Sequence, residues 1–190
     1  YSNERSENFS IRTEIHEDPE GKRKVYKVAD CPEGETHLRN IWESCKKLER
    51  VYRNTPIRLN QCLPAENGIE LGYVTGTTLE NFLDEMLKEK REDQLKGTFK
   101  KYLDTLQKAA ALPFSMTKDF IKVFGNAKIP ENELCPEYTN LDPVCGNILW
   151  SDKEWVMLDY EWSFSFPVPV RYQIYRVIKY YLYTSTARGK

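Results

Sequence analysis

Two stretches decide the fold: Asn140-Leu-Asp-Pro-Val-Cys-Gly-Asn-Ile-Leu-Trp150 and, after a short turn, Trp155-Val-Met-Leu-Asp-Tyr-Glu161. Asp142 and Asn147 are spaced for one tight loop that leads into a strand, and Asp159 ends a second hydrophobic strand. An antiparallel hairpin of this kind brings a proton acceptor and two oxygen ligands for a metal ion together. The hairpin therefore predicts a reactive site with Asp142 as the acceptor and Asn147 and Asp159 as the ligands.

Length and charge narrow the class of protein. The 190 residues fit one medium domain, or two small lobes that share a site. With 28 Lys and Arg against 29 Asp and Glu, the net charge is −1, and the two signs are interspersed along the chain. Because nucleic-acid-binding domains usually carry a one-sided basic patch, we expect no nucleic-acid partner.

The cysteines and the apolar stretches indicate the compartment. The five cysteines are odd in number and widely scattered: Cys31, Cys45, Cys62, Cys135 and Cys145. No CxxC pair occurs, which argues against a disulfide framework or a zinc site and favours reduced cysteines in a cytoplasmic protein. The apolar stretch 162–183 contains two prolines and three basic residues, so we expect no transmembrane segment.

The chain opens on Tyr1 rather than on Met, and we interpret it as a piece of a longer protein. The other domains of that longer chain are then expected partners. Through them, a cytoplasmic domain would reach the inner face of a membrane.

The first part of the chain predicts strands and one helix. Period-two alternation and helical spacing of apolar residues give the order of these elements. We expect strands at 9–15 and 24–29, a helix at 34–52, and strands at 57–63 and 69–74.

Gly76 marks a change to helical patterns. Beyond it, Thr77 and Glu80 have the spacing of a capping box. Apolar stripes predict helices near 79–87, 99–106 and 114–124 and, after the hairpin, near 174–181. The expected fold class is α+β, with a small β-rich N-lobe (1–75) and a larger, mainly helical C-lobe (76–190).

These residues, in this order, resemble the protein-kinase-like phosphotransferases, closest to the aminoglycoside and choline kinase branch. The catalytic loop of that branch reads H-x-D-x-x-x-x-N, which Asp142 and Asn147 match, and its metal-binding strand ends in D-[FWY]-E, which Asp159-Tyr-Glu161 matches. The resemblance covers nearly the whole chain. It implies a bilobal kinase-like fold, ATP and Mg²⁺ as cofactors, and phosphoryl transfer to a hydroxyl group.

The resemblance gives each hairpin residue a role. Asp142 is the base or orienting group for the attacking hydroxyl, although an Asp-Pro pair also serves simply to open a turn. Asn147 and Asp159 offer oxygens to Mg²⁺, with a turn asparagine and a strand-end aspartate as the alternatives. Glu161 either supports the metal or caps the following turn.

Lys27, in Val25-Tyr-Lys-Val28, resembles the V-x-[IV]-K element of the family. Strand alternation puts Val25 and Lys27 on one face, so Val25 would cover an adenine while Lys27 reaches the α/β-phosphates. By spacing, Glu43 on the next helix is the expected partner of Lys27, with Glu35 as the second choice. A solvated Lys27 is the alternative, because basic residues are common in this strand.

The stretch Leu71-Gly-Tyr-Val-Thr-Gly76 resembles the hinge between the lobes. Its contacts with adenine would be made by the Gly72 carbonyl and the Val74 amide. An ordinary connector between a strand and a helix is the alternative.

Histidines and tyrosines add no second site by pattern. His16 and His37 are solitary, and we expect His37 on a helix surface. The tyrosines of the last helix fit core and lobe packing, with a sugar-stacking platform as the alternative.

Three departures from the family pattern bear on activity. The glycine-rich phosphate loop is missing: its place is taken by Ser2-Asn-Glu-Arg-Ser-Glu-Asn8. We expect the first strand of the N-lobe to be truncated or to lie outside this chain. Asn140 stands where the branch has a histidine. The chain between Asp159 and the final helix is too short for the activation segment of kinases that act on proteins.

We therefore expect an ATP/Mg-dependent phosphotransferase acting on a hydroxyl of a small molecule or saccharide. Segments such as Phe166-Pro-Val-Pro169 also resemble domains appended to bacterial glycosyltransferases and methyltransferases for surface polysaccharides, which implies a glycan acceptor. The alternative is an inactive kinase-like module that binds or docks the partner domains of a larger protein. The missing glycines and Asn140 motivate that alternative.

Overall fold

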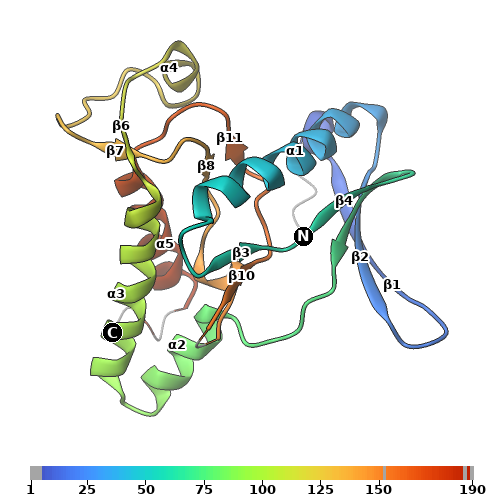
Figure 1. Cartoon of the computed structure of the whole chain (residues 1–190), viewed down its shortest axis with the longest axis horizontal. Coiled ribbons are helices and arrows are strands. Elements are labelled where there is room, and N and C mark those ends of the chain that lie inside the picture. The colour runs from blue at the N-terminus through green and yellow to red at the C-terminus, as the bar shows by residue number, and fades with distance from the viewer. Residues whose placement is uncertain (1–5, 152, 186–187, 189–190) are drawn as a thin grey trace.

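The computed structural model describes residues 6–151, 153–185 and 188, and its N-terminal part is built on a four-stranded sheet (Figure 1). The strands pair antiparallel in the order β1 (Ile11–Glu17), β2 (Arg23–Ala29), β5 (Gly68–Gly72) and β4 (Cys62–Ala65). Lys27 pairs with Thr13 on one side and with Ile69 on the other, so it lies in an inner strand. The hairpin expected from 9–15 and 24–29 is confirmed.

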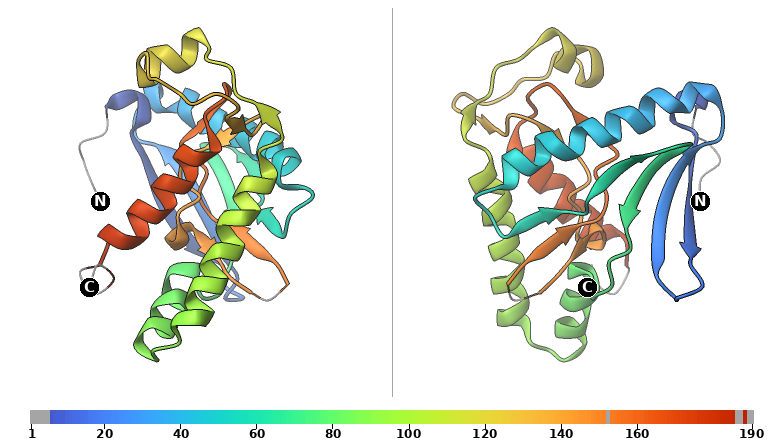
Figure 2. Two further views of the ribbon diagram at one scale, coloured as in Figure 1. Left: turned by 90° about the vertical axis from the view of Figure 1, so that its left-hand side faces the viewer. Right: turned by 45° about the vertical axis from the view of Figure 1, so that its right-hand side comes forward.

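Helix α1 (Glu35–Tyr52) follows two short 3-10 turns, η1 (Glu7–Phe9) and η2 (Pro32–Gly34), and crosses the molecule (Figure 2). One stripe of α1 is buried: His37, Leu38, Ile41, Ser44, Cys45, Leu48 and Tyr52. Spacings of three and four residues are those of a helix that packs one face on a core. This face contacts β2, β4 and β5, and then β3. The helix predicted at 34–52 is confirmed.

A second, three-stranded sheet joins the two halves of the sequence. It consists of β3 (Ile57–Leu59), which runs parallel to β10 (Trp155–Met157), and β9 (Ile148–Leu149), which is antiparallel to β10. The single strand expected at 57–63 is therefore wrong. The chain leaves the second sheet at Asn60, whose amide donates to the Met157 carbonyl, and enters the first sheet as β4.

The C-terminal part is mainly helical. Its helices are α2 (Leu79–Lys88), α3 (Glu92–Ala109), α4 (Lys118–Phe124) and α5 (Val170–Tyr183). Two short ribbons complete it: β6 (Leu112–Pro113) with β7 (Leu134–Cys135), and β8 (Thr139–Asn140) with β11 (Ser163–Phe164). The α+β class, with a β-rich N-terminal part and a helical C-terminal part, is confirmed and is consistent with the bilobal arrangement expected.

The cap of α2 differs from the prediction by one residue. The side chain of Thr78, not of Thr77, accepts a hydrogen bond from the Asn81 amide (3.1 Å). Thr78 has extended backbone angles, as an N-cap requires.

One core cluster connects both parts of the chain. It contains residues from helices and from both sheets: Leu48, Ile57, Leu71, Leu83, Leu106, Met157 and Val177. A smaller cluster around Phe120, Leu141 and Val168 lies under α4 and the loop before α5. Burying these side chains is the main favourable contribution to folding, and it holds β9 and β10 rigidly against α2 and α3.

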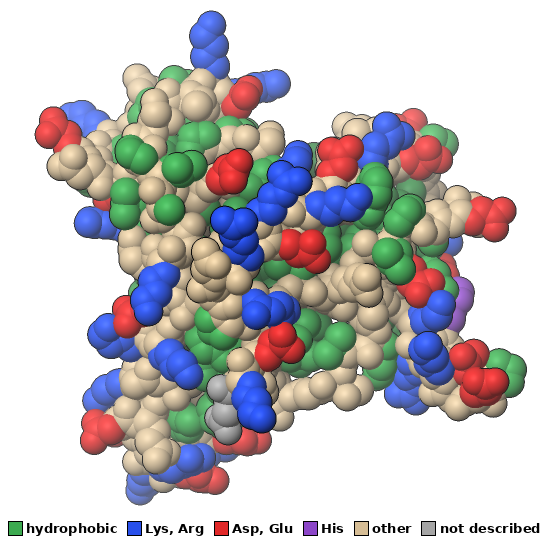
Figure 3. All heavy atoms as spheres, in the orientation of Figure 1, with side chains coloured by type: hydrophobic (Ala, Val, Ile, Leu, Met, Phe, Trp, Pro, Cys, Tyr) green, Lys and Arg blue, Asp and Glu red, His purple; other side chains and the backbone are tan. Residues whose placement is uncertain are grey.

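Charged side chains are spread over the surface. On the face shown in Figure 3, Lys and Arg alternate with Asp and Glu rather than gathering by sign. Among the described residues, no helix combines the length and the apolar character that crossing a membrane requires.

Candidate functional site

Asn140 forms hydrogen bonds to both chain segments of the predicted site, the loop that contains Asp142 and the strand end at Asp159. Its side chain is fully buried; Oδ1 accepts a hydrogen bond from the Asp142 amide (2.9 Å) and Nδ2 donates to the Asp159 carbonyl (3.1 Å). From α5, Gln173 donates to the Asn140 carbonyl (2.5 Å). Asn140 thus holds the loop and the strand end in register, at the position where the kinase-like branch has a histidine.

Asn147, in the 3-10 turn η3 (Cys145–Asn147), is oriented by the same loop. Its Nδ2 donates to the Asp142 carbonyl (3.1 Å). Because a carbonyl can only accept, this bond fixes the amide and directs Oδ1 away from it. The Asn147 carbonyl in turn accepts from the Leu158 amide (2.8 Å). An amide oxygen is thereby presented beside the loop.

Asp142 is held by an arginine from α5. Arg176 Nη2 donates to Asp142 Oδ1 (2.6 Å), and Arg176 Nε donates to the Leu141 carbonyl (2.7 Å). The Arg176 guanidinium also lies over the Tyr180 ring, 5.0 Å from its centroid. Burial raises the pKa of the Asp142 carboxyl above its ordinary value, and Arg176 opposes that rise.

Arg176 is a site residue that the sequence reasoning missed. It lies 34 residues after Asp142, on a helix read only as an apolar stripe. Arg176 lies on α5 one turn after Gln173 and one turn before Tyr180, so the helical spacing puts these three side chains on one face. Nothing in a single sequence shows that this face of α5 packs against the loop of Asp142.

Lys27 meets Asp159 and Glu161. Its Nζ lies 3.2 Å from Asp159 Oδ1 and 3.3 Å from Glu161 Oε2. The other oxygen of Glu161, Oε1, lies 3.0 Å from His37 Nε2. The side chains of Lys27, Glu161 and His37 are all less than a tenth exposed, whereas that of Asp159 is 38% exposed. The alternative of a solvated Lys27 is therefore wrong.

Two expectations about α1 are corrected. Glu43 and Glu35 are exposed, so neither is the buried partner of Lys27. His37 is buried rather than on the helix surface. Both errors have one physical cause, because the stripe of α1 that faces the core begins at His37 and continues through Ile41 and Ser44, whereas Glu43 lies on the solvent side.

The carboxylate of Asp159 and the amide oxygen of Asn147 are suitable ligands for a magnesium ion. Asp159 Oδ1 accepts from Lys27 Nζ and from the Glu161 amide, and no hydrogen bond from a described residue reaches Oδ2. Mg²⁺ commonly takes one or two carboxylates and completes its shell with phosphate oxygens and water. One carboxylate and one amide oxygen suit such a shared site. In the part of the chain that the structure describes, no group of three or more His, Cys, Asp or Glu side chains forms a cage for a metal on its own.

A cavity of about 440 Å³ opens beside Asp142. Asp142, Asn147 and Arg176 form its polar wall, and its apolar wall consists of Leu141, Val144, Trp162, Phe164 and Tyr180. A cavity of this size and mixed lining is typical of sites that take small organic molecules.

The segment 71–76, predicted to contact adenine as a hinge, also makes contacts within the protein. Asn60 Nδ2 already donates to the Gly72 carbonyl (2.9 Å), which was expected to read adenine. Val74 is exposed in the connector to α2. Val25 is half-buried and packs against the core beside Lys27. Of the segment proposed in place of the glycine-rich loop, residues 2–5 lie outside the described residues.

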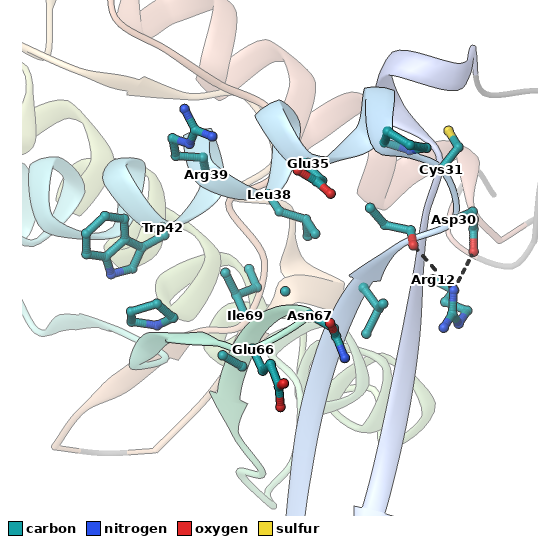
Figure 4. Close-up of a pocket in the computed structure, with 16 residues that line it drawn as sticks. Arg12, Asp30, Cys31, Glu35, Leu38, Arg39, Trp42, Glu66, Asn67 and Ile69 are labelled. Atoms are coloured by element: carbon teal, nitrogen blue, oxygen red, sulfur yellow. Dashed lines mark hydrogen bonds and ion pairs between the residues drawn. The ribbon is translucent and has the colours of Figure 1, made fainter.

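A larger cavity lies elsewhere, between α1 and the turn from β4 to β5 (Figure 4). It has a volume of about 740 Å³, and Glu35, Arg39 and Trp42 face it from the helix. None of the residues predicted to bind nucleotide or metal lines it. Cavity size alone therefore does not select a candidate site, and we take the hairpin as the candidate because polar groups converge there.

Comparisons with known proteins give a distant likeness. No family model matches the chain, and no curated protein matches it either. Among solved structures, the chain is similar to macrolide 2'-phosphotransferase MphH from Brachybacterium faecium, solved as the apoenzyme. The two share 9% identity with a TM-score of 0.44 over 95% of this chain and 76% of that chain. At this level of similarity, we take neither activity nor residue roles from the neighbour.

Proposed function

We propose that this protein is an ATP/Mg-dependent phosphotransferase that acts on a hydroxyl of a small molecule or saccharide. One observation carries the proposal: two carboxylates (Asp142 and Asp159), an amide oxygen (Asn147) and a buried lysine (Lys27) converge from three segments of the chain. Phosphoryl transfer needs these groups, because its catalysis is mostly positioning and charge stabilisation.

The nucleotide side of the proposed site consists of Lys27, Asp159 and Asn147. Lys27 binds phosphate oxygens, while Asn147 Oδ1 and Asp159 are the ligands of Mg²⁺. When bound, the ion neutralises charge on the phosphates. Val25 covers the adenine, and the Val74 amide and the Gly72 carbonyl contact its edge. The Gly72 carbonyl oxygen has two lone pairs; one accepts from Asn60 Nδ2, and the other is available to the adenine.

On the acceptor side, Asp142 orients the hydroxyl and takes its proton. A carboxylate with a raised pKa is a better proton acceptor than an ordinary one, and burial raises the pKa of Asp142. Arg176 keeps the carboxylate ionised and fixes its direction through Oδ1. The second oxygen, Oδ2, receives no hydrogen bond from the described residues and is the proposed contact for the hydroxyl.

The surroundings of the cavity support a saccharide as the acceptor. A second hollow of about 250 Å³ shares Arg176 and Tyr180 with it and continues along α5 past Tyr172, Tyr175 and Tyr183. Tyrosine combines an apolar ring with a polar tip, as sugars combine apolar faces with hydroxyls. A glycan acceptor is also what the surface-polysaccharide resemblance implies.

Two structural facts favour the alternative of an inactive binding module. Arg176 occupies one oxygen of Asp142, and neither glutamate expected on α1 approaches Lys27. An inactive module would bind Mg-ATP, or dock a partner, without transferring phosphate.

The deciding experiment measures ADP release with a panel of mono- and oligosaccharides, each paired with a derivative whose hydroxyls are methylated. We expect Mg-dependent ADP release that the free sugars accelerate and their methylated counterparts do not. Equal rates with both members of each pair would contradict a hydroxyl acceptor. Binding of Mg-ATP without ADP release in any pair would contradict a saccharide acceptor and favour the inactive module.

A further inference from the structure

The partner of Lys27 does not come from α1. The carboxylate that holds the buried lysine is Glu161, which follows β10, and the α1 side chain that reaches the same carboxylate is His37. Both glutamates expected for this role, Glu43 and Glu35, point to solvent or to the separate cavity shown in Figure 4.

The three side chains form one continuous chain of charge-assisted hydrogen bonds. Lys27 Nζ lies 3.3 Å from one oxygen of Glu161, and His37 Nε2 lies 3.0 Å from the other. Because an ionised carboxylate only accepts, Nε2 is the donor. A carboxylate buried to this degree is stable only when its oxygens have donors, so each donor limits where Glu161 can lie.

His37 is itself held in place by aromatic rings. Phe9 meets its ring edge-on at 5.0 Å between centroids, and Trp162 lies at 5.7 Å. Phe9 and Trp162 also contact each other at 5.2 Å. The imidazole therefore has little rotational freedom, and its Nε2 is directed at Glu161.

We propose that His37 is a positioning residue: it orients Glu161, and Glu161 holds Lys27 toward the phosphates of the nucleotide. The inference rests on the proposed function for the identity of the ligand, a nucleoside triphosphate. Asp159 shares Lys27 but is far more exposed than Glu161, so the two carboxylates divide the work. Asp159 serves the metal, while Glu161 keeps the lysine in place.

Two substitutions at residue 37 separate positioning from packing. His37→Gln keeps a donor near the position of Nε2 but removes the ring, whereas His37→Phe keeps the ring between Phe9 and Trp162 but removes the donor. Glu161→Gln weakens the hold on Lys27 directly, and Glu43→Gln is the matched control on α1. Calorimetry with Mg-ATP and the KM for ATP are the readouts.

We expect Glu161→Gln and His37→Phe each to weaken Mg-ATP binding about 10-fold, as loss of a supporting contact typically does. His37→Gln should restore most of the affinity, and Glu43→Gln should leave it unchanged. The KM for ATP should rise more than kcat falls. Weakening by Glu43→Gln, or equal losses for the two His37 variants, would overturn the proposal.

A second measurement keeps the inference separate from the proposed function. If the unaltered protein binds no Mg-ATP, the proposed function fails, and thermal unfolding then decides the role of His37. Double-mutant cycles of Lys27→Met and His37→Phe with Glu161→Gln should be non-additive in melting temperature, because the groups share one network. Additive shifts would overturn the network itself.

Discussion

The proposed acceptor side and the proposed nucleotide side of the site are built in different ways. On the acceptor side, Asp142 and Arg176 form one ion pair, 2.6 Å long, at the wall of a cavity. On the nucleotide side, Lys27, Glu161 and His37 form a buried network joined to the more exposed Asp159. Substitutions on the acceptor side should therefore alter turnover, whereas those on the nucleotide side should alter affinity and stability together.

The largest effect is expected from Asp142→Asn. Loss of a general base typically costs a factor of 10² to 10⁴, so we expect kcat to fall about 1000-fold. The Kd for Mg-ATP should change little, because the proposed function places Asp142 against the acceptor and not against the nucleotide. Steady-state kinetics and calorimetry on one preparation measure both quantities. Equal losses in kcat and in affinity would break the division between the two sides.

Lys27→Met should produce the largest loss of stability. It removes the ammonium group that lies 3.3 Å from the buried Glu161 carboxylate, and removing one partner of a buried ion pair typically costs 3–5 kcal/mol. Because Asp159 is partly exposed, we expect a decrease of about 3 kcal/mol in the free energy of unfolding, at the lower end of that range. Urea unfolding measures it. Lys24→Met is the matched control and should have a smaller effect, since Lys24 lies on the same strand and its side chain, paired with Glu70, is 44% exposed.

Arg176→Met should shift the pH dependence of kcat/KM. The proposed role of Asp142 as proton acceptor requires its ionised form, so activity should be lost as pH falls through its pKa. Arg176 lowers that pKa, against the rise caused by burial, so removing the guanidinium should move the acidic limb of the kcat/KM profile to higher pH. The profiles of both proteins with one acceptor test this. A limb that stays in place would show that Asp142 is not the group that titrates.

The smallest effect is expected from a helix cap. Thr78→Ala removes the cap of α2, which typically costs about 1 kcal/mol. Because Thr78 contacts neither Lys27 nor Asp142, kcat and the Kd for Mg-ATP should not change. If Thr78→Ala lowered the affinity for Mg-ATP, loss of stability alone would be enough to weaken nucleotide binding. The affinity losses predicted for the nucleotide-side substitutions would then no longer distinguish the two sides.

The sequence predicted what depends on local spacing. Asp142, Asn147 and Asp159 lie within one loop and one hairpin, so their convergence follows from the short turn between β9 and β10. The fold class and most elements followed in the same way from periodicity. The break at Asn60 was missed because both flanking strands fit one apolar pattern.

Contacts between distant segments were beyond a single sequence. Arg176 and Asp142 meet because α5 packs against the loop, and no periodicity encodes that meeting. His37 had a usable signal, because it lies four residues before Ile41 and so belongs to the buried stripe. Glu43 was predicted from its spacing along the chain, although its phase on the helix places it in solvent.

The central claim is that the converging groups bind a nucleotide together with Mg²⁺. Calorimetric titration of ATP, with and without Mg²⁺, tests it most directly on the unaltered protein and on Asp159→Asn, which keeps the size of the side chain but removes its charge. We predict Mg-dependent binding that Asp159→Asn weakens by at least about 10-fold. Binding that is indifferent to Mg²⁺, or an Asp159→Asn protein that binds as tightly as the unaltered one, would contradict the claim.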